Sequence, residues 1–366
     1  MMDGQGSTTR ISFRNDYSEG AHPRLLQALA QASADQHAGY GTDRHTARAV
    51  ALIRNAVAQP QADVHLLVGG TQTNLIAISA FLRPHQAVIA VDAAHIATHE
   101  TGAIEATGHK VLTVPALHDK LTPALIQPVL AVHGNEHMVQ PRLVYISNST
   151  ESGTLYTRAE LEELSGFCRA NDLLLYLDGA RLGAALTADG NDLDLPTIAA
   201  LTDAFYIGGT KNGALLGEAL VIVNPALQPD LRYLIKQRGA LLAKGMVLGA
   251  QFAALFEDGL FFELAAHANA MAQRLRAGLL AAGAHFTSDS PTNQQFIAVS
   301  AQQAAQLAQG YDFERWEVRT DGSQVIRFVT SWATTATAVD RLCADVAALC
   351  STPQCRAMTR PQGRQR

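Results

Sequence analysis

Cysteine is scarce in this sequence of 366 residues, which contains only Cys168, Cys343, Cys350 and Cys355. None belongs to a Cys-x-x-Cys pair or stands beside a cluster of histidines. Neither a disulfide framework nor a zinc site is therefore indicated, and we expect free thiols and no bound metal. Thiols in this state favour a reducing, cytoplasmic location.

Long apolar runs and an excess of one charge are missing as well. No stretch of about 18 apolar residues is present that could span a membrane. The polar first residues lack the apolar core of a signal peptide. The formal net charge is -5, with acidic and basic residues interspersed, which provides no footprint for nucleic acid. We expect a protein that is not exported and binds neither membranes nor nucleic acid.

Apolar, β-rich runs alternate with helical stretches over the first two thirds of the chain. The runs lie at residues 65–69, 87–92, 110–115, 142–147, 173–177, 203–207 and 219–224. This alternation predicts an α/β fold whose mostly parallel, doubly wound, seven-stranded sheet is covered by helices on both faces. The last two runs are too close for a crossover helix, so we expect them to form an antiparallel hairpin.

The sequence suggests a short arm, two domains and a tail. We place the N-terminal arm at residues 1–25, a large domain at 26–255, a small C-terminal α+β domain at 256–352 and a disordered tail at 353–366. Strand candidates at 296–300 and 325–329 and a final helix at 336–349 define the small domain. The tail contains four arginines and no apolar periodicity, which is typical of a disordered segment.

One lysine stands on a short turn between two of the apolar runs. Residues 208–213 read Gly-Gly-Thr-Lys-Asn-Gly, which places Lys211 at the turn of the expected hairpin. Burial favours the neutral amine, which can act as a nucleophile or form a Schiff base with a carbonyl group. A surface lysine in an ordinary turn is the alternative, because lysine is seldom buried.

Two further segments favour the chemical interpretation. The leucine-rich run at 173–177 ends in Asp178, and a carboxylate there can pair with the protonated ring nitrogen of pyridoxal phosphate (PLP). Residues 69–73 read Gly-Gly-Thr-Gln-Thr between a strand and an apolar helix, and such a helix start suits a phosphate. The order of phosphate cup, ring carboxylate and lysine is typical of PLP enzymes of the aspartate aminotransferase fold type.

With these motifs, the chain resembles the low-specificity L-threonine aldolases almost from end to end. The matching stretches are residues 13–16, 39–43, 70–74, 94–95, 149–157, 178–181, 210–213 and 327–335. The resemblance implies a PLP-dependent transferase-like fold of type I and a homo-oligomer, either a dimer or a tetramer. It also implies cleavage of L-threonine, L-allo-threonine or bulkier L-β-hydroxy-α-amino acids such as phenylserine to glycine and an aldehyde.

The resemblance also assigns roles to individual residues. The catalytic residues would be Lys211, His95 and Glu151. The cofactor would be held by Lys211, Asp178, His95, Gly70, Thr71, Gln72, Arg181 and Lys244, and the substrate by Arg327, Arg181, Asn15 and Tyr40. His95 would stack on the PLP ring and orient or deprotonate the β-hydroxyl. Arg327 would hold the α-carboxylate by two parallel hydrogen bonds, and so fix which bond stands perpendicular to the ring.

Three positions depart from the family pattern. Asn15 replaces a serine that helps to hold the carboxylate, although its amide can still donate a hydrogen bond. Glu151 lies where other members carry a second histidine, and it is either a general base or a group that polarises water. Met246 lies where an arginine would contact the phosphate, so that Lys244 takes over this contact or PLP affinity is reduced.

Two other functions remain open at this point. A β-eliminating lyase or dehydratase uses the same electron sink but breaks the Cα–H bond, and yields a 2-oxo acid instead of glycine and an aldehyde. A protein that has lost activity and serves as a binding module would be colourless without PLP. The joint presence of Lys211, Asp178 and Arg327 argues against this second alternative.

Overall fold

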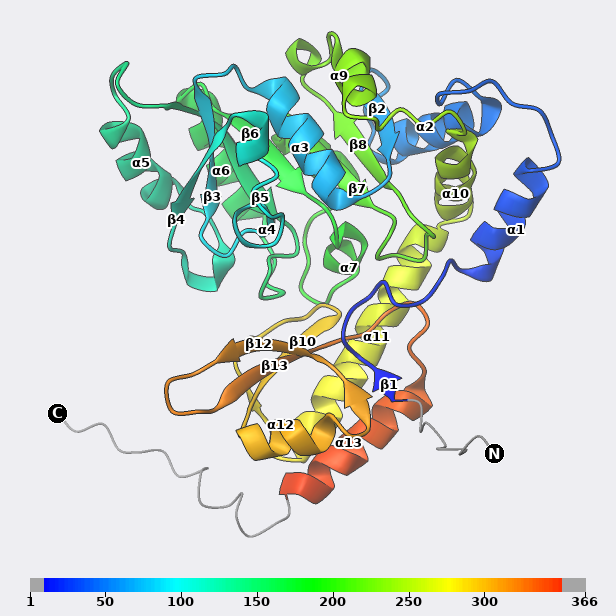
Figure 1. Cartoon of the computed structure of the whole chain (residues 1–366), viewed down its shortest axis with the longest axis vertical. Coiled ribbons are helices and arrows are strands. Elements are labelled where there is room, and N and C mark those ends of the chain that lie inside the picture. Colours follow the sequence, from blue (N-terminus) through cyan, green and yellow to red (C-terminus); the bar gives the residue numbers. More distant parts are fainter. Residues whose placement is uncertain (1–9, 351–366) are drawn as a thin grey trace, which may run out of the picture. The chain divides into compact units, whose positions relative to one another are not determined.

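The computed structural model describes residues 10–350. The segment expected to be a disordered tail, 353–366, lies outside these residues. The described chain divides into a large unit, residues 20–266, and a small unit, residues 10–19 together with 267–350. Figure 1 shows the elements of both units in their chain order. The helices and strands of each unit are described in turn.

The large unit is built on a sheet of seven strands, in the order β2-β8-β7-β6-β5-β3-β4. Six of them run parallel, and only β8 is antiparallel to both of its neighbours. The strands are β2 (Asp63–Leu67), β3 (Gln86–Val91), β4 (Lys110–Val114), β5 (Gln140–Ser147), β6 (Leu174–Asp178), β7 (Ala204–Gly208) and β8 (Glu218–Ile222). The predicted α/β fold with a mostly parallel, seven-stranded sheet is confirmed.

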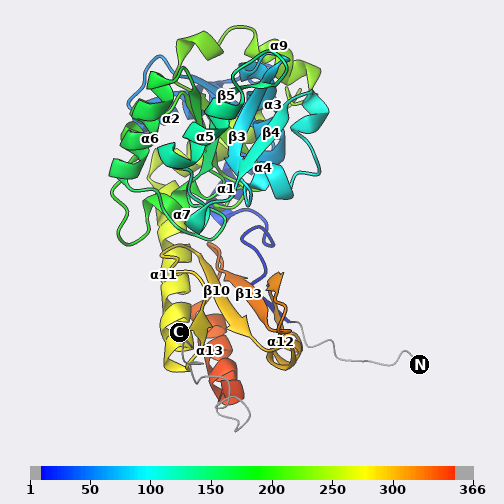
Figure 2. The same cartoon turned by 90° about the vertical axis from the view of Figure 1, so that its left-hand side faces the viewer.

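Helices cover both faces of this sheet, as Figures 1 and 2 show. Helix α3 lies on one face, and α6 with α8 lies on the other. The helices of the unit are α1 (Pro23–Ala32), α2 (Arg44–Ala56), α3 (Gly70–Phe81), α4 (His95–Thr98), α5 (Pro123–Val132), α6 (Arg158–Ala170), α7 (Leu182–Leu186), α8 (Leu195–Leu201), α9 (Leu231–Gln237) and α10 (Met246–Glu257). Every residue of β6, β7 and β8 is buried, which explains why these strands read as continuous apolar runs.

The hairpin expected around Lys211 is present. Strands β7 and β8 pair antiparallel, with Gly208 opposite Glu218. Across the turn, Gly209 and Thr210 both donate their N–H groups to the carbonyl of Gly217 at 3.0 Å. These bonds fix the backbone on the N-terminal side of the lysine.

The small unit contains a four-stranded antiparallel sheet in the order β12-β13-β10-β9. Its strands are β9 (His285–Phe286), β10 (Gln294–Val299), β12 (Glu314–Val318) and β13 (Gln324–Val329), and a parallel pair is formed by β1 (Ile11–Ser12) and β11 (Tyr311–Asp312). Its helices are the C-terminal part of α11 (Leu260–Ala281), α12 (Ala301–Leu307) and α13 (Ala336–Cys350). The strands expected at 296–300 and 325–329 correspond to β10 and β13.

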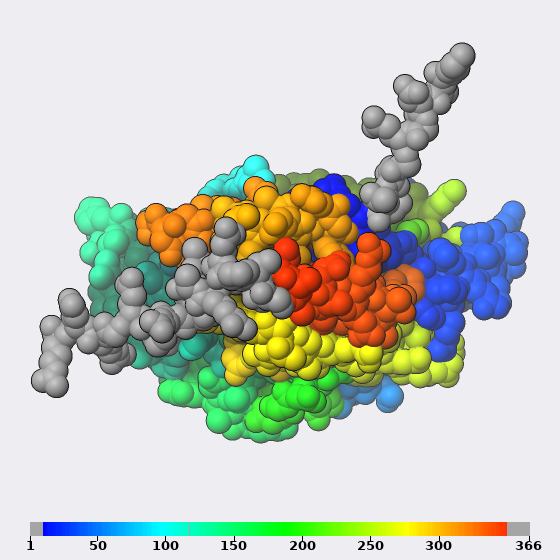
Figure 3. All heavy atoms as spheres, turned by 90° about the horizontal axis from the view of Figure 1, so that it is seen from below, coloured from blue at the N-terminus to red at the C-terminus, as the bar shows by residue number. Residues whose placement is uncertain are grey.

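The core of the small unit joins its helices to its sheet. Helices α11 and α13 lie side by side, yellow and red in Figure 3, and contribute Leu275, Leu279 and Leu342 to this core. Phe13 from the N-terminal arm is fully buried in the same core. The arm is therefore an integral part of the small unit.

None of the helices among residues 10–350 is long and apolar enough to cross a membrane.

Candidate active site

Three of the predicted site residues follow neighbouring parallel strands. Strand β3 has β4 on one side and β5 on the other, so the order of connection reverses at this point. In open α/β sheets, ligands bind at such a switch point, beyond the carboxyl ends of the strands. His95 follows β3, Glu151 follows β5 and Asp178 ends β6. The topology therefore brings all three to one edge of the sheet.

Asp178 is buried at the end of β6 and accepts four hydrogen bonds. Tyr145 donates to its carboxyl group at 2.5 Å, Tyr206 at 2.6 Å, Asn74 at 3.0 Å and the backbone of Ala180 at 3.0 Å. Burial alone would raise the pKa of Asp178, but these hydrogen bonds outweigh it and the pKa is lowered. Asp178 is therefore a stable buried anion.

Close backbone packing ties Asp178 to the hairpin of Lys211. A Cβ atom on Gly179 would lie 1.8 Å from the carbonyl oxygen of Tyr206, and one on Gly208 would lie 2.4 Å from that of Ala180. Gly208 also donates its N–H to the carbonyl of Gly179 at 3.0 Å. Only glycine permits this approach, which places the loop after β6 directly against the end of β7.

The Lys211 hairpin contains a second ionisable group, Glu218. Its carboxyl group is buried and accepts the N–H of Gly209 at 3.1 Å. Burial raises the pKa of Glu218 to about 8, although the positive charge of Lys211 acts in the opposite direction. Lys211 also acts electrostatically on His95, so the lysine lies within reach of both groups.

His95 is the first residue of α4, and a third of its side chain is exposed. Its Nδ1 lies 2.8 Å from Oε1 of Glu100, a carboxylate whose side chain is fully buried. Burial lowers the pKa of His95, but the hydrogen bond with Glu100 and the charges of Glu151 and Asp178 raise it above its ordinary value. The imidazole is therefore easier to protonate than a free histidine.

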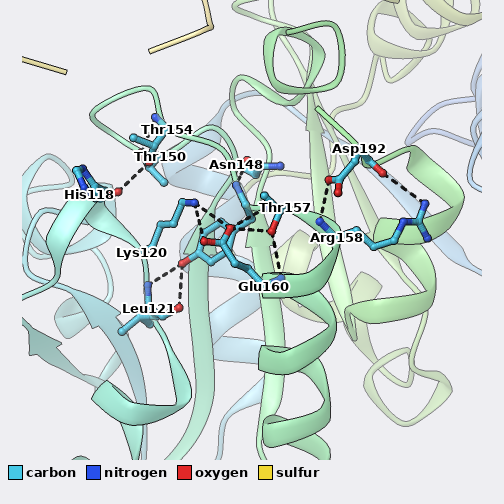
Figure 4. A network of polar contacts seen from close by, with 11 residues as sticks. His118, Lys120, Leu121, Asn148, Thr150, Thr154, Thr157, Arg158, Glu160 and Asp192 are labelled. Carbon is cyan, nitrogen blue, oxygen red and sulfur yellow. Dashed lines mark hydrogen bonds and ion pairs between the residues drawn. The ribbon is translucent and has the colours of Figure 1, made fainter. Parts of the chain in front are cut away.

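Glu151 lies on a loop that several contacts hold in place, shown in part in Figure 4. Thr154 donates to the carbonyl of His118 at 2.8 Å, and Asp119 accepts the N–H of Ser152 at 3.0 Å. At the far end of the loop, Thr157 caps α6 together with Glu160. Glu151 lines a small pocket together with Asp119, Tyr145 and Tyr156. The hydroxyl of Thr150 also lies 2.7 Å from that of Thr154, so the loop is fixed on both sides of Glu151.

The start of α3 has the features of an anion site. Gly69 precedes the helix, no side chain caps its first turn, and the first N–H groups of a helix have no partner within it. A Cβ atom on Gly70 would lie 3.0 Å from the hydroxyl of Tyr206, the same hydroxyl that donates to Asp178. Gly70, Thr71 and Gln72 therefore begin the helix next to the Asp178 network.

Two other predicted residues belong to a second cluster of the large unit. Tyr40 donates its N–H to the carbonyl of Ala243 at 3.2 Å, and Lys236 lies over its ring at 4.4 Å. Lys244 is exposed and follows Ala243 directly. Tyr40 and Lys244 are thus brought close to each other. Arg181, the residue before α7, is half-buried and follows the glycine-packed loop after Asp178.

Arg327 and Asn15 belong to the small unit. The guanidinium of Arg327 is buried on β13, donates to Oε1 of Gln294 at 3.1 Å and lies 4.7 Å from the ring of Trp316. Oδ1 of Asn15 accepts hydrogen bonds from Tyr17 and Ser18, which leaves its amide nitrogen as the group that can donate to a ligand.

Several residues of the site were not predicted as such. They are Asn74, Glu100, Tyr145, Tyr206 and Glu218. The sequence did contain a pattern that pointed to the two tyrosines, since a hydroxyl group within an otherwise apolar strand usually has a hydrogen-bond partner. Glu218 could also have been predicted, because a charged residue at the start of an apolar strand is unusual. No sequence pattern distinguished Glu100 from an exposed glutamate.

Comparison with known proteins gives consistent results. Residues 13–302 match the family model described as beta-eliminating lyase. The low specificity L-threonine aldolase of a Pseudomonas species is 34% identical over 347 residues, which are 93% of this chain and 98% of that protein. The enzyme of the same name from Pseudomonas aeruginosa is 32% identical, over 91% of this chain and 96% of its own length.

Solved structures agree with these sequence matches. A threonine aldolase from Leishmania major has a TM-score of 0.91 and 52% identity, and the match covers 93% of this chain and 99% of that one. An aspartate aminotransferase from Thermus thermophilus has a TM-score of 0.71 at 16% identity, over 94% of this chain and 92% of its own. This second likeness concerns the fold alone.

Proposed function

Since the chain belongs to the beta-eliminating lyase family and, within it, resembles the low-specificity L-threonine aldolases throughout, we propose that it cleaves L-β-hydroxy-α-amino acids to glycine and an aldehyde. L-Threonine and L-allo-threonine are the first substrates to consider, followed by bulkier ones such as phenylserine. The enzyme is a PLP-dependent lyase of the carbon–carbon type.

The residues of the large unit suit PLP. Asp178 is a buried anion, and a protonated ring nitrogen of PLP needs such a negatively charged partner. The uncapped start of α3 suits the phosphate, and Gly70 leaves room beside Tyr206. Lys211 lies on the adjacent hairpin, where its amine would hold the carbonyl carbon of the group. The large unit thus offers a partner for the ring nitrogen, the phosphate and the aldehyde carbon of PLP.

When bound, PLP supplies the electron sink for the carbanion that forms as the Cα–Cβ bond breaks. Asp178 would stabilise the protonated ring nitrogen, since its four hydrogen bonds lower its own pKa and keep it an anion. Because Nδ1 of His95 is bonded to Glu100, Nε2 is the ring nitrogen that would face the substrate. Nε2 would accept the proton of the β-hydroxyl, while Glu151 either assists as a base or orients a water molecule.

Substrate orientation would depend on arginine. Arg327, held between Gln294 and Trp316, offers its fork of N–H groups to the α-carboxylate, and Arg181 would assist. The amide nitrogen of Asn15 would make a further contact. Fixing the carboxylate would restrict the rotation of the substituents on Cα, and so would favour cleavage of the Cα–Cβ bond over loss of the Cα proton.

The observation that carries the proposal is the buried, four-fold hydrogen-bonded Asp178 packed against the Lys211 hairpin. The test is to incubate the PLP-saturated protein with L-threonine, L-allo-threonine and L-threo-phenylserine, and to quantify glycine and the corresponding aldehyde. Equal amounts of both products support the proposal. A 2-oxo acid with ammonia would instead assign the protein to the eliminating lyases, the alternative that the comparisons do not favour.

The assembly and location are also proposed. We infer a homo-oligomer, a dimer or a homotetramer, from the resemblance to the low-specificity L-threonine aldolases. Light scattering on the purified protein checks this. Cys168 and Cys343 are free thiols, which supports a cytoplasmic location.

A further inference from the structure

A buried carboxylate, Glu100, bonds to the histidine of the site. Its side chain is inaccessible to solvent, and its Oε1 lies 2.8 Å from Nδ1 of His95. The same oxygen accepts a second hydrogen bond, at 2.8 Å, from the amide nitrogen of Asn74. Glu100 thus joins a residue that follows β3 to a residue on α3.

Asn74 continues this connection to Asp178. Its amide nitrogen donates to Asp178 at 3.0 Å as well as to Glu100. The hydroxyl of Tyr176 donates to Oδ1 of Asn74 at 3.2 Å, which turns the amide nitrogen toward the two carboxylates. An unbroken series of hydrogen bonds therefore runs from His95 through Glu100 and Asn74 to Asp178.

Glu100 is poorly satisfied in comparison with Asp178. Both oxygens of Asp178 accept hydrogen bonds, whereas Oε2 of Glu100 is buried and accepts none from residues 10–350. A buried carboxylate in this state is costly, and an apolar or amide side chain would be easier to accommodate. A carboxylate at this position would, however, stabilise a positively charged neighbour. Among the described residues, the titratable group that is hydrogen-bonded to Glu100 is His95.

Resting on the proposed function, we propose that Glu100 is a positioning residue that keeps one proton of His95 on Nδ1 and so presents Nε2 to the β-hydroxyl of the substrate. An ionised carboxylate can only accept a hydrogen bond, so Nδ1 must be the donor. The same carboxylate stabilises the imidazolium that forms when Nε2 takes up the proton. Glu100 does not touch the reacting atoms and acts through His95.

Other charged and titratable groups also act on His95. They are Glu151, Asp178, Lys211 and, in ring contact at 5.6 Å, His99. None of these four groups makes a hydrogen bond to the imidazole; within the described part of the chain its side-chain hydrogen-bond partner is Glu100. A variant of Glu100 therefore changes the direct partner of His95 and leaves the more distant charges in place.

Glu100→Gln is the most informative substitution. Because a single oxygen of Glu100 accepts both hydrogen bonds, the oxygen of glutamine can accept both as well. The variant therefore removes the charge and keeps the geometry. The control is Asp63→Asn, since the carboxyl group of Asp63 lies 2.8 Å from Nε2 of a second histidine, His65, on β2 and outside the site.

The experiment is side-chain nitrogen NMR of histidine-labelled, PLP-loaded protein without substrate, with the His95 signals identified by their absence in His95→Asn. In wild type we expect the neutral ring to carry its proton on Nδ1. In Glu100→Gln we expect the titration midpoint of His95 to fall by about one pH unit or more, a tenfold change in proton affinity. In Asp63→Asn it should stay at the wild-type value.

Two results would overturn the inference. One is a neutral His95 in wild type that carries its proton on Nε2, which can be seen without any variant. The other is a His95 midpoint in Glu100→Gln that matches wild type. Neither the tautomer of His95 nor its titration midpoint depends on turnover. A protein that produced no glycine would therefore refute the proposed function, while the NMR titration would still test the role of Glu100.

Discussion

Gly209 donates its backbone N–H to the carboxyl group of Glu218 over 3.1 Å, across the turn of the hairpin that carries Lys211. This contact joins the two strands at the point where Thr210 also bonds to Gly217. The hairpin is therefore held by a side chain as well as by its backbone. The protonation state of that side chain should affect the stability of the fold.

We expect stability to fall as pH rises through the titration of Glu218. Burial raises the pKa of Glu218 to about 8, so the native state keeps a proton that the unfolded chain has already released. The native state then binds more protons between the ordinary glutamate pKa and about 8, and the free energy of unfolding decreases with rising pH in this window.

Glu218→Gln should remove this pH dependence. In wild type, we expect the free energy of unfolding to fall by up to about 1.4 kcal/mol for each pH unit within the window. Urea unfolding of the PLP-saturated wild type and variant across the window measures both slopes. If the free energy of unfolding changed with pH equally in wild type and Glu218→Gln, Glu218 would have the same pKa in the folded and the unfolded protein, and the prediction would be wrong.

Lys211→Ala should abolish turnover and the borohydride-reducible attachment of PLP. The reason is that no other amine would hold the carbonyl carbon of the cofactor. The attachment is measured by mass spectrometry after reduction. The control is Lys110→Ala, an exposed lysine at the start of β4, which should behave as wild type. An active Lys211→Ala protein would refute the mechanism.

Asp178→Asn should lower turnover by about 10²-fold or more, because a neutral amide does not keep the ring nitrogen protonated. Tyr145→Phe removes one of the hydrogen bonds that lower the pKa of Asp178 and leaves the charge, so its loss should be smaller. Steady-state kinetics with saturating PLP compares the two. Equal losses in both variants would mean that packing, and not charge, accounts for the effect.

Glu151→Gln should lower kcat and move the pH profile of kcat/KM to lower pH. Its charge is one of the causes that raise the pKa of His95, and that cause is lost in the variant. Because Nε2 acts as a base, activity rises as pH passes the pKa of His95, and the rise should occur earlier. Glu105→Gln, at an exposed carboxylate, serves as the control. An unmoved profile would exclude Glu151 from the surroundings of His95.

Arg327→Lys should raise KM for the amino acid by about tenfold or more, since an ammonium group cannot make two parallel hydrogen bonds to a carboxylate. Stacking on Trp316 is also lost. Arg319→Lys, in the same unit on a half-exposed side chain, is the control. An unchanged KM would mean that another group binds the carboxylate.

The sheet of the large unit was predictable because most of its central strands are buried on both faces. β6, β7 and β8 are buried throughout and apolar except for Asp178 and Glu218 at their ends, and the short interval around Lys211 permits only a hairpin. The strands of the small unit were harder to find. β12 alternates between partly buried and exposed residues, and β9 and β11 have two residues each, so none forms an apolar run.

The site was predictable where a residue stands at the end of a strand. Asp178 and Lys211 are charges that follow apolar runs, and it was their combination with the glycine-containing helix start at 69–73 that predicted a site. Asn74, Glu100 and Glu218 were not assigned, because their importance lies in hydrogen bonds between segments far apart in the chain. Such bonds depend on strand order and register, which a single sequence does not specify.

The stacking of Arg327 on Trp316 has an optical consequence. The chain has two tryptophans, Trp316 and Trp332, and both belong to the small unit. The large unit, which contains the network around Asp178, has tyrosines but no tryptophan among residues 20–266. Indole fluorescence therefore reports the state of the small unit, while the absorption of PLP would report that of the large one. A single unfolding experiment that follows both signals can tell whether the two halves of the molecule melt together or one after the other.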